Sequence, residues 1–159
     1  MSFARPAFGI AIAAALLCAC NEKPPTKPYA PGLGEIMTFT QMRHAKLWLA
    51  GSAGNWDLAA YEVSELEEGF HDAAEFHPND ESSPVPIGKF VTAMTSGPLA
   101  ALRAAIDKKN AGAFTEAFDS LTDACNACHR ATGHGFNVIT RPKGNAFLNQ
   151  DFAPRRRPR

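Results

Sequence analysis

Two cysteines and a histidine constrain this chain most, because their spacing fixes a local structure. They stand in the segment Cys125-Asn126-Ala127-Cys128-His129. Residues three and four positions apart share one face of an α-helix, so a helix here presents both thiols and the imidazole on one side. Two cysteines separated by two residues and followed by histidine form the attachment signature of a c-type haem. The signature predicts one covalent haem c on Cys125 and Cys128, with His129 as the proximal iron ligand.

Other interpretations of these residues stay open. Zinc could be bound by Cys125, Cys128, His129 and His134, but such sites usually join two separated pairs of ligands and no second cysteine pair is available here. A redox dithiol is expected beside a strand and a helix, and the sequence predicts no strand. A third possibility makes both cysteines small core residues of a helix. The haem interpretation accounts for all three side chains at once.

The N-terminus predicts export. Arg5 precedes an apolar run from Ala7 to Cys20, which is too short to span a bilayer and has the layout of a secretory signal. We therefore expect residues 1–19 to be a signal peptide and the mature chain to lie in the periplasm. This is the compartment in which c-type haem is attached.

The end of the apolar run predicts a lipid anchor. Leu17-Cys18-Ala19-Cys20 resembles a bacterial lipobox, so Cys20 would be the lipidated first residue of the mature protein. Ordinary cleavage by signal peptidase nearby is the alternative. Asn21, rather than aspartate, follows Cys20, and among Gram-negative lipoproteins this points to the outer membrane.

Proline and charge define the segments at either end of the mature chain. Residues 20–33 are rich in proline and predict an extended tether. Beyond residue 19 the chain holds 15 basic and 16 acidic residues, and four of the arginines lie in the tail, at positions 155, 156, 157 and 159. The remainder is mildly acidic, which argues against a nucleic-acid partner. The tail could contact anionic lipid or an acidic protein.

Apolar periodicity between residues 34 and 133 predicts one domain of four helices. The expected helices run from about Gly34 to Ala50, Asn55 to Ala74, Ile87 to Lys109 and Ala111 to Thr132. Gly97-Pro98 is expected to kink the third helix or divide it. Short connections between helices favour antiparallel neighbours, so the fold class is all-α, a four-helix bundle.

The fourth helix links the bundle to the haem signature. Phe114, Phe118 and Leu121 lie on one stripe that continues into Cys125 and Cys128. The haem would therefore be attached near the C-terminal end of helix four and buried against the core. Residues 134–159 form an extension, in which five apolar residues could cover the bundle: Phe136, Val138, Ile139, Phe147 and Leu148.

These features resemble the cytochrome c′ family, including its low-spin members with methionine ligation. The resemblance covers about residues 34–132 and rests on the helix count, the motif on the fourth helix and Trp56-Asp57 at the start of the second. It implies a haem-binding bundle and a homodimer. It also implies a distal methionine early in the first helix, where Met37 stands twenty residues before Asp57.

The sixth iron ligand decides the function. A methionine or histidine there makes the iron low-spin and suits it to electron transfer, whereas a vacant position binds NO or CO. Met37 is the candidate distal ligand and His44, two turns later, is the alternative. Ile36 would face a ligand-free distal pocket. Met37 as ordinary core packing is the simplest alternative.

The sequence thus predicts a monohaem c-type cytochrome that carries single electrons between redox partner proteins near the membrane. Arg43 is a candidate partner for a haem propionate, since a guanidinium can bind a carboxylate through two hydrogen bonds. No nucleophile–base pair or carboxylate dyad is apparent, so we do not expect an enzyme. A five-coordinate gas-binding haem protein is the main alternative, and a zinc-binding lipoprotein the third.

Overall fold

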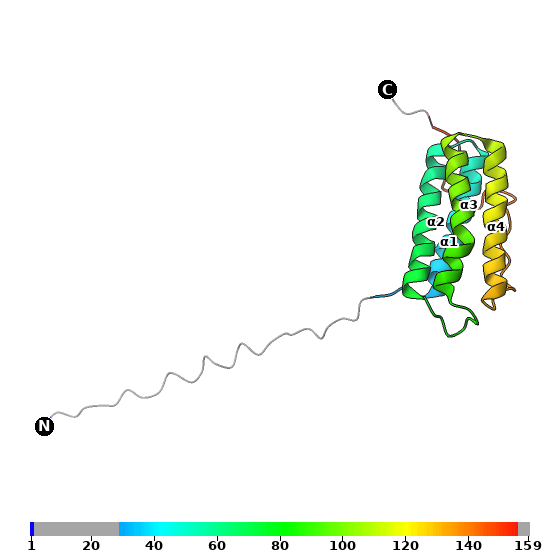
Figure 1. The fold of residues 1–159 in the computed structure, drawn as a ribbon. Helices are drawn as coiled ribbons and strands as arrows, with labels where there is room; N and C mark the ends of the chain where they lie inside the picture. Colours follow the sequence, from blue (N-terminus) through cyan, green and yellow to red (C-terminus); the bar gives the residue numbers. More distant parts are fainter. Residues whose placement is uncertain (2–28, 156–159) are drawn as a thin grey trace.

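The computed structural model describes Met1 and residues 29–155, which fold into an all-α four-helix bundle (Figure 1). Its helices are α1 (Leu33–Ser52), α2 (Trp56–Phe76), α3 (Ile87–Asp107) and α4 (Ala111–Ala131). The predicted fold class is confirmed. The expected signal peptide, Cys20, most of the tether and three of the four tail arginines lie outside the described residues.

Capping residues set the helix ends close to where the sequence predicted them. The Asn55 side chain accepts a hydrogen bond from the Leu58 backbone N–H at 3.3 Å, and Asn110 accepts one from the Ala113 N–H at 3.1 Å. Gly133 follows α4 with a φ of +84°, a conformation that favours glycine. α3 is one continuous helix through Pro98, so the expected division of this helix does not occur.

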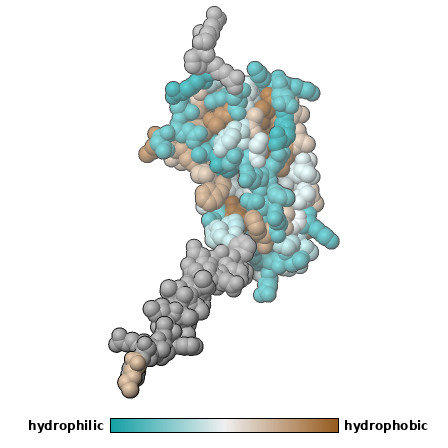
Figure 2. Space-filling model, turned by 90° about the vertical axis from the view of Figure 1, so that its left-hand side faces the viewer, coloured by the Kyte–Doolittle hydropathy of each residue, from teal (hydrophilic) through white to brown (hydrophobic). Residues whose placement is uncertain are grey.

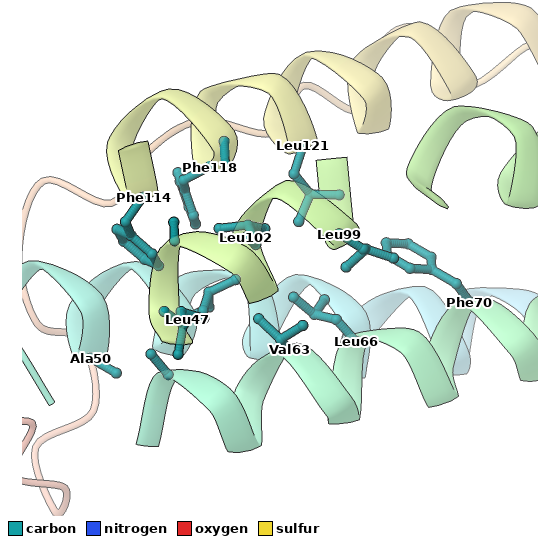
Figure 3. Close-up of a cluster of buried hydrophobic side chains, with 14 of the residues drawn as sticks. Leu47, Ala50, Val63, Leu66, Phe70, Leu99, Leu102, Phe114, Phe118 and Leu121 are labelled. Carbon is teal, nitrogen blue, oxygen red and sulfur yellow. The ribbon is translucent and has the colours of Figure 1, made fainter. Parts of the chain in front are cut away.

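The apolar core fills one end of the bundle (Figure 3). In this antiparallel arrangement the C-terminal halves of α1 and α3 meet the N-terminal halves of α2 and α4. Leu47, Leu66, Leu102, Phe118 and Leu121 have no exposed surface. Burial of such side chains stabilises the fold by about 1.5–3 kcal/mol each. The opposite end of the bundle, where α1 begins and α4 ends, contains a cavity.

The C-terminal extension fills the seam between α1 and α4, which contact each other less than the other neighbouring helices of the bundle do. Arg141 pairs with Asp119 of α4 at 2.5 Å and places its guanidinium 4.2 Å from the ring centroid of Trp48 in α1. Further along, Phe152 is buried in the core and the Asn55 side chain donates to the Ala153 carbonyl at 3.3 Å. The extension is therefore part of the bundle.

The extension buries fewer of its apolar residues than the sequence suggested. Ile139 is buried and Phe147 is half-buried, whereas Phe136 and Leu148 are 84% and 98% exposed. Val138 is exposed as well. The expectation of a covering role thus holds for two of the five residues.

One face of the bundle is mainly polar. Figure 2 shows the face toward the left of Figure 1, where apolar residues form separate spots among hydrophilic ones. Within the described residues, no helix combines the length and apolar character that crossing a bilayer requires.

Packing around Gly51 gives a test of the core. A Cβ atom at Gly51 would collide with the ring of the buried Phe114, so Gly51→Ala forces the phenyl ring out of its place. We expect the variant to lower the free energy of unfolding by about 1–3 kcal/mol in urea titrations. Gly112→Ala is the control, because its Cβ would meet only Asn110 Oδ1 at 3.5 Å. Equal stabilities for the two variants would contradict this packing.

Candidate functional site

A cavity of about 360 Å³ lies at the end of the bundle opposite the apolar core. All four helices, the loop after α2 and the C-terminal extension contribute to its walls. Its volume falls in the range of small-molecule and cofactor sites. The predicted residues that line it are Met37, His44, Cys125, Cys128 and His129. Met37 and Cys125, which are 88 positions apart in the sequence, thus line the same cavity.

The thiols of α4 belong to half-buried residues on one wall of this cavity. Phe114, Phe118 and Leu121 pack the core, and the same helix stripe continues into Cys125. Neither cysteine forms a disulfide. Burial raises the pKa of Cys125 to about 12, and it raises the pKa of Cys128 as well. A redox-active Cys-x-x-Cys pair has a lowered thiol pKa, so this environment disfavours the redox dithiol interpretation.

The imidazole of His129 has one defined tautomer. Its Nδ1 lies 2.6 Å from the backbone carbonyl oxygen of Asn137. Since a carbonyl can only accept, Nδ1 carries the hydrogen and Nε2 carries the lone pair. Nε2 makes no hydrogen bond with the residues that the structure describes. Metal-binding histidines typically have this arrangement, in which the second ring nitrogen donates to a carbonyl or carboxylate.

The four side chains considered for zinc do not form a ligand cluster. Among residues 29–155, no three His, Cys, Asp or Glu side chains converge as zinc ligands would. His134 lines the cavity, but its Nδ1 lies 3.3 Å from Thr132 Oγ1. A tetrahedral site would require these side chains to move together.

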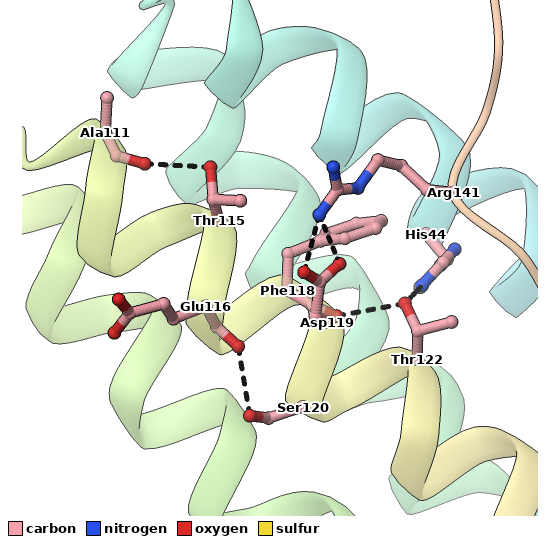
Figure 4. Close-up of polar contacts among 9 residues, drawn as sticks. All are labelled: His44, Ala111, Thr115, Glu116, Phe118, Asp119, Ser120, Thr122 and Arg141. Atoms are coloured by element: carbon pink, nitrogen blue, oxygen red, sulfur yellow. Dashed lines mark hydrogen bonds and ion pairs between the residues drawn. The ribbon is translucent and has the colours of Figure 1, made fainter.

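Met37 and His44 reach the cavity from α1, and only His44 is tied to other residues. His44 Nε2 lies 2.9 Å from Thr122 Oγ1, which itself donates to the Phe118 carbonyl (Figure 4). Nε2 therefore donates to the hydroxyl oxygen. The ring also packs on Phe118 with centroids 4.4 Å apart, and burial lowers the pKa of His44 to about 4. Met37, which is half-buried, has no such hydrogen bond to give up.

Ile36 and Arg43 lie away from the cavity walls. Ile36 is buried and lines a separate shallow groove beside Phe39 and Gly69. Arg43 pairs with Glu65 at 2.7 Å and with the buried Glu62 at 3.4 Å. Burial raises the pKa of Glu62, and the nearby guanidinium of Arg43 acts in the opposite direction. The structure thus gives Arg43 a partner in α2 and does not bring it to the cavity.

Sequence reasoning did not identify three further residues of the site. Thr122 holds His44, Asn126 binds the backbone of Ile139, and Asn137 accepts from His129. Thr122 could have been identified from the sequence, because it is a polar residue one helical turn before Cys125. Asn137 acts through its backbone carbonyl, and no residue type signals such a contact.

Comparison with protein-family models, curated proteins and solved structures finds no match to this chain. The site is therefore interpreted from its own residues.

The ion pair of Arg43 gives a test of where this residue acts. Arg43→Met would leave the carboxylate of Glu62 buried without its partner, and we expect a loss of about 3 kcal/mol in the free energy of unfolding. The double variant Arg43→Met/Glu62→Gln should recover most of that loss. Arg103→Met is the control, since its pair with Glu67 is exposed and should contribute less than about 1 kcal/mol. A similar loss for both single variants would contradict this assignment.

Burial of His44 makes stability depend on pH. The ring has a pKa of about 4 when folded and 6.5 when free, so the unfolded chain binds a proton first as the pH falls. This contribution is fully present above pH 6.5 and is lost as the pH falls toward 4, with about 2 kcal/mol lost between pH 7 and pH 5. Urea titrations at both pH values should show a smaller loss for His44→Gln, which keeps a donor for Thr122. An equal loss in both proteins would refute the neutral buried ring.

Proposed function

We propose that this chain is a monohaem c-type cytochrome that carries single electrons. The observation that supports this most is the cavity itself, which combines Cys125, Cys128 and His129 on α4 with Met37 on α1. The residues fit the group. Two thiols stand one turn apart, the free nitrogen of His129 is the one that a metal would need, and a thioether faces the same space. Haem bound there would supply a one-electron couple of iron.

In this proposal each part of the chain has a physical role. Cys125 and Cys128 would hold the porphyrin covalently, and His129 and Met37 would supply ligands to its iron. Four hydroxyl groups in the walls donate to backbone carbonyls one turn earlier at 2.7–2.9 Å, those of Thr38, Thr40, Thr95 and Thr132. These hydroxyls therefore need no water as a partner. A rigid site changes little between oxidation states, and methionine ligation raises the reduction potential.

We further propose that the protein works in the periplasm, anchored by lipid on Cys20 to the outer membrane, and exchanges electrons with redox partner proteins. The acidic bundle gives no basis for a nucleic-acid partner. No reaction on a substrate is proposed. The resemblance to the cytochrome c′ family supports the haem-binding bundle and suggests a homodimer, which sedimentation of the purified protein would detect.

Mass spectrometry of protein exported from cells with haem-attachment machinery tests the proposal directly. We expect the mature chain to carry the added mass of one haem. Cys125→Ser/Cys128→Ser should lose it, because thioether bonds need both thiols. A wild-type chain without haem would refute both the electron-carrier and the gas-binding function and would favour a zinc or thiol protein.

The distal ligand is tested by Met37→Ala. We expect a low-spin absorption spectrum with a methionine–iron charge-transfer band in the wild type, and loss of this band in the variant. Met42→Ala is the control, because Met42 lies on the same helix but does not line the cavity. An unchanged low-spin spectrum in Met37→Ala would point to His44. A high-spin ferric wild type would instead favour a vacant site that binds NO or CO.

A further inference from the structure

We propose that the segment after α4 positions the proximal histidine and that Asn126 is the residue that holds this segment in place. The inference rests on the proposed haem function and adds to it a role for a spacer residue of the attachment signature and for the chain that follows the signature. It begins from the hydrogen bond between His129 Nδ1 and the Asn137 carbonyl at 2.6 Å.

The chain reverses direction immediately after α4, which brings Asn137 back beside His129. Gly133 has a φ of +84°, where a side chain would be strained. The His134 backbone N–H then donates to the His129 carbonyl at 2.7 Å, and the Asn137 N–H donates to the His134 carbonyl at 2.9 Å. These two bonds form a tight turn whose last carbonyl faces the imidazole.

Asn126 clamps the chain two residues beyond this contact. Its Nδ2 donates to the Ile139 carbonyl at 2.8 Å, and its Oδ1 accepts from the Ile139 N–H at 2.8 Å. One side-chain amide thus satisfies both backbone groups of a buried residue that lines the cavity. The Asn137 carbonyl is held from two sides, by the turn before it and by the clamp after it.

The rest of the extension prevents the clamped segment from lifting away. Arg141, two residues after Ile139, is fixed between Asp119 and Trp48. Phe152 is buried in the core. The hydrogen bond to His129 is therefore supported by contacts along the whole seam.

This arrangement has a chemical consequence for the iron. A carbonyl that accepts from Nδ1 fixes the orientation of the ring and raises the basicity of Nε2. A more basic ligand favours ferric over ferrous iron and so lowers the reduction potential. The segment would thus set both the position and the donor strength of His129.

The test compares Asn126→Ala with Asn145→Ala in the haem-loaded, full-length protein. Asn145 is a matched control, because it also makes two hydrogen bonds to the backbone of the extension, one to Gln150 and one to Phe147. In protein labelled with ¹⁵N-histidine, we expect Asn126→Ala to speed exchange of the His129 Nδ1 hydrogen by about tenfold or more. Its reduction potential should rise, while Asn145→Ala should match the wild type in both measurements.

A haem-loaded Asn126→Ala with wild-type exchange and potential would overturn this proposal and leave the proposed function intact. Equal changes in the two variants would overturn it too, since they would indicate general loosening. Should Asn126→Ala fail to accumulate with haem, Asn126→Asp keeps the acceptor for Ile139 N–H and removes the donor. It should also speed the exchange, and an unchanged rate would overturn the proposal. A wild type without haem would refute the proposed function, and this inference with it.

Discussion

The register of α4 is the constraint on which the rest of this structure depends. One stripe of this helix packs the core through Phe114, Phe118 and Leu121, and the same stripe reaches the cavity at Cys125. A helix face that begins as core therefore ends as a binding wall. Rotation of α4 by one residue would expose the thiols and unpack the core together. The stability of the bundle thus helps to keep the reactive groups directed inward.

The two ends of the bundle have different roles. One end stabilises the fold through its apolar core, and the other end contains the cavity. At one end large apolar side chains such as Phe114 and Phe118 are buried against one another, while at the other end polar residues such as Thr40 and Thr95 are among those that line the cavity. Both hydroxyls are satisfied within their own helices. These two hydroxyls therefore need no water as a partner, although the cavity lies beside a polar loop. A rigid apolar end can support an end whose own packing is incomplete.

Local signals in the sequence predicted the helices, the start of α2 near Asn55 and the helix stripe that carries the cysteines. Of the two outcomes predicted for Pro98, a kink or a division, the division does not occur. α3 continues through Pro98 and packs against both α2 and α4, although proline removes one hydrogen bond of the helix. The extension could not be placed from the sequence. Three contacts hold it to the bundle: the Asn126 side chain binds the backbone of the extension, the Arg141 guanidinium lies over a tryptophan ring, and Phe152 is buried in the core. None of these contacts follows the sequence periodicity of a helix or a strand, so only the structure reveals them.

The contacts on α1 also bear on which residue would bind the iron on the distal side of the proposed haem. For His44 to become a ligand, its ring would have to give up the hydrogen bond to Thr122 or bind through its other nitrogen while still stacked on Phe118. Met37 would lose no comparable hydrogen bond on becoming a ligand, because a thioether is only a weak acceptor. The three rotatable bonds of its side chain also let it adapt to the space available. His44 then serves as a fixed part of the wall, neutral because it is buried. This difference in what each side chain must lose favours sulfur over nitrogen at the sixth position.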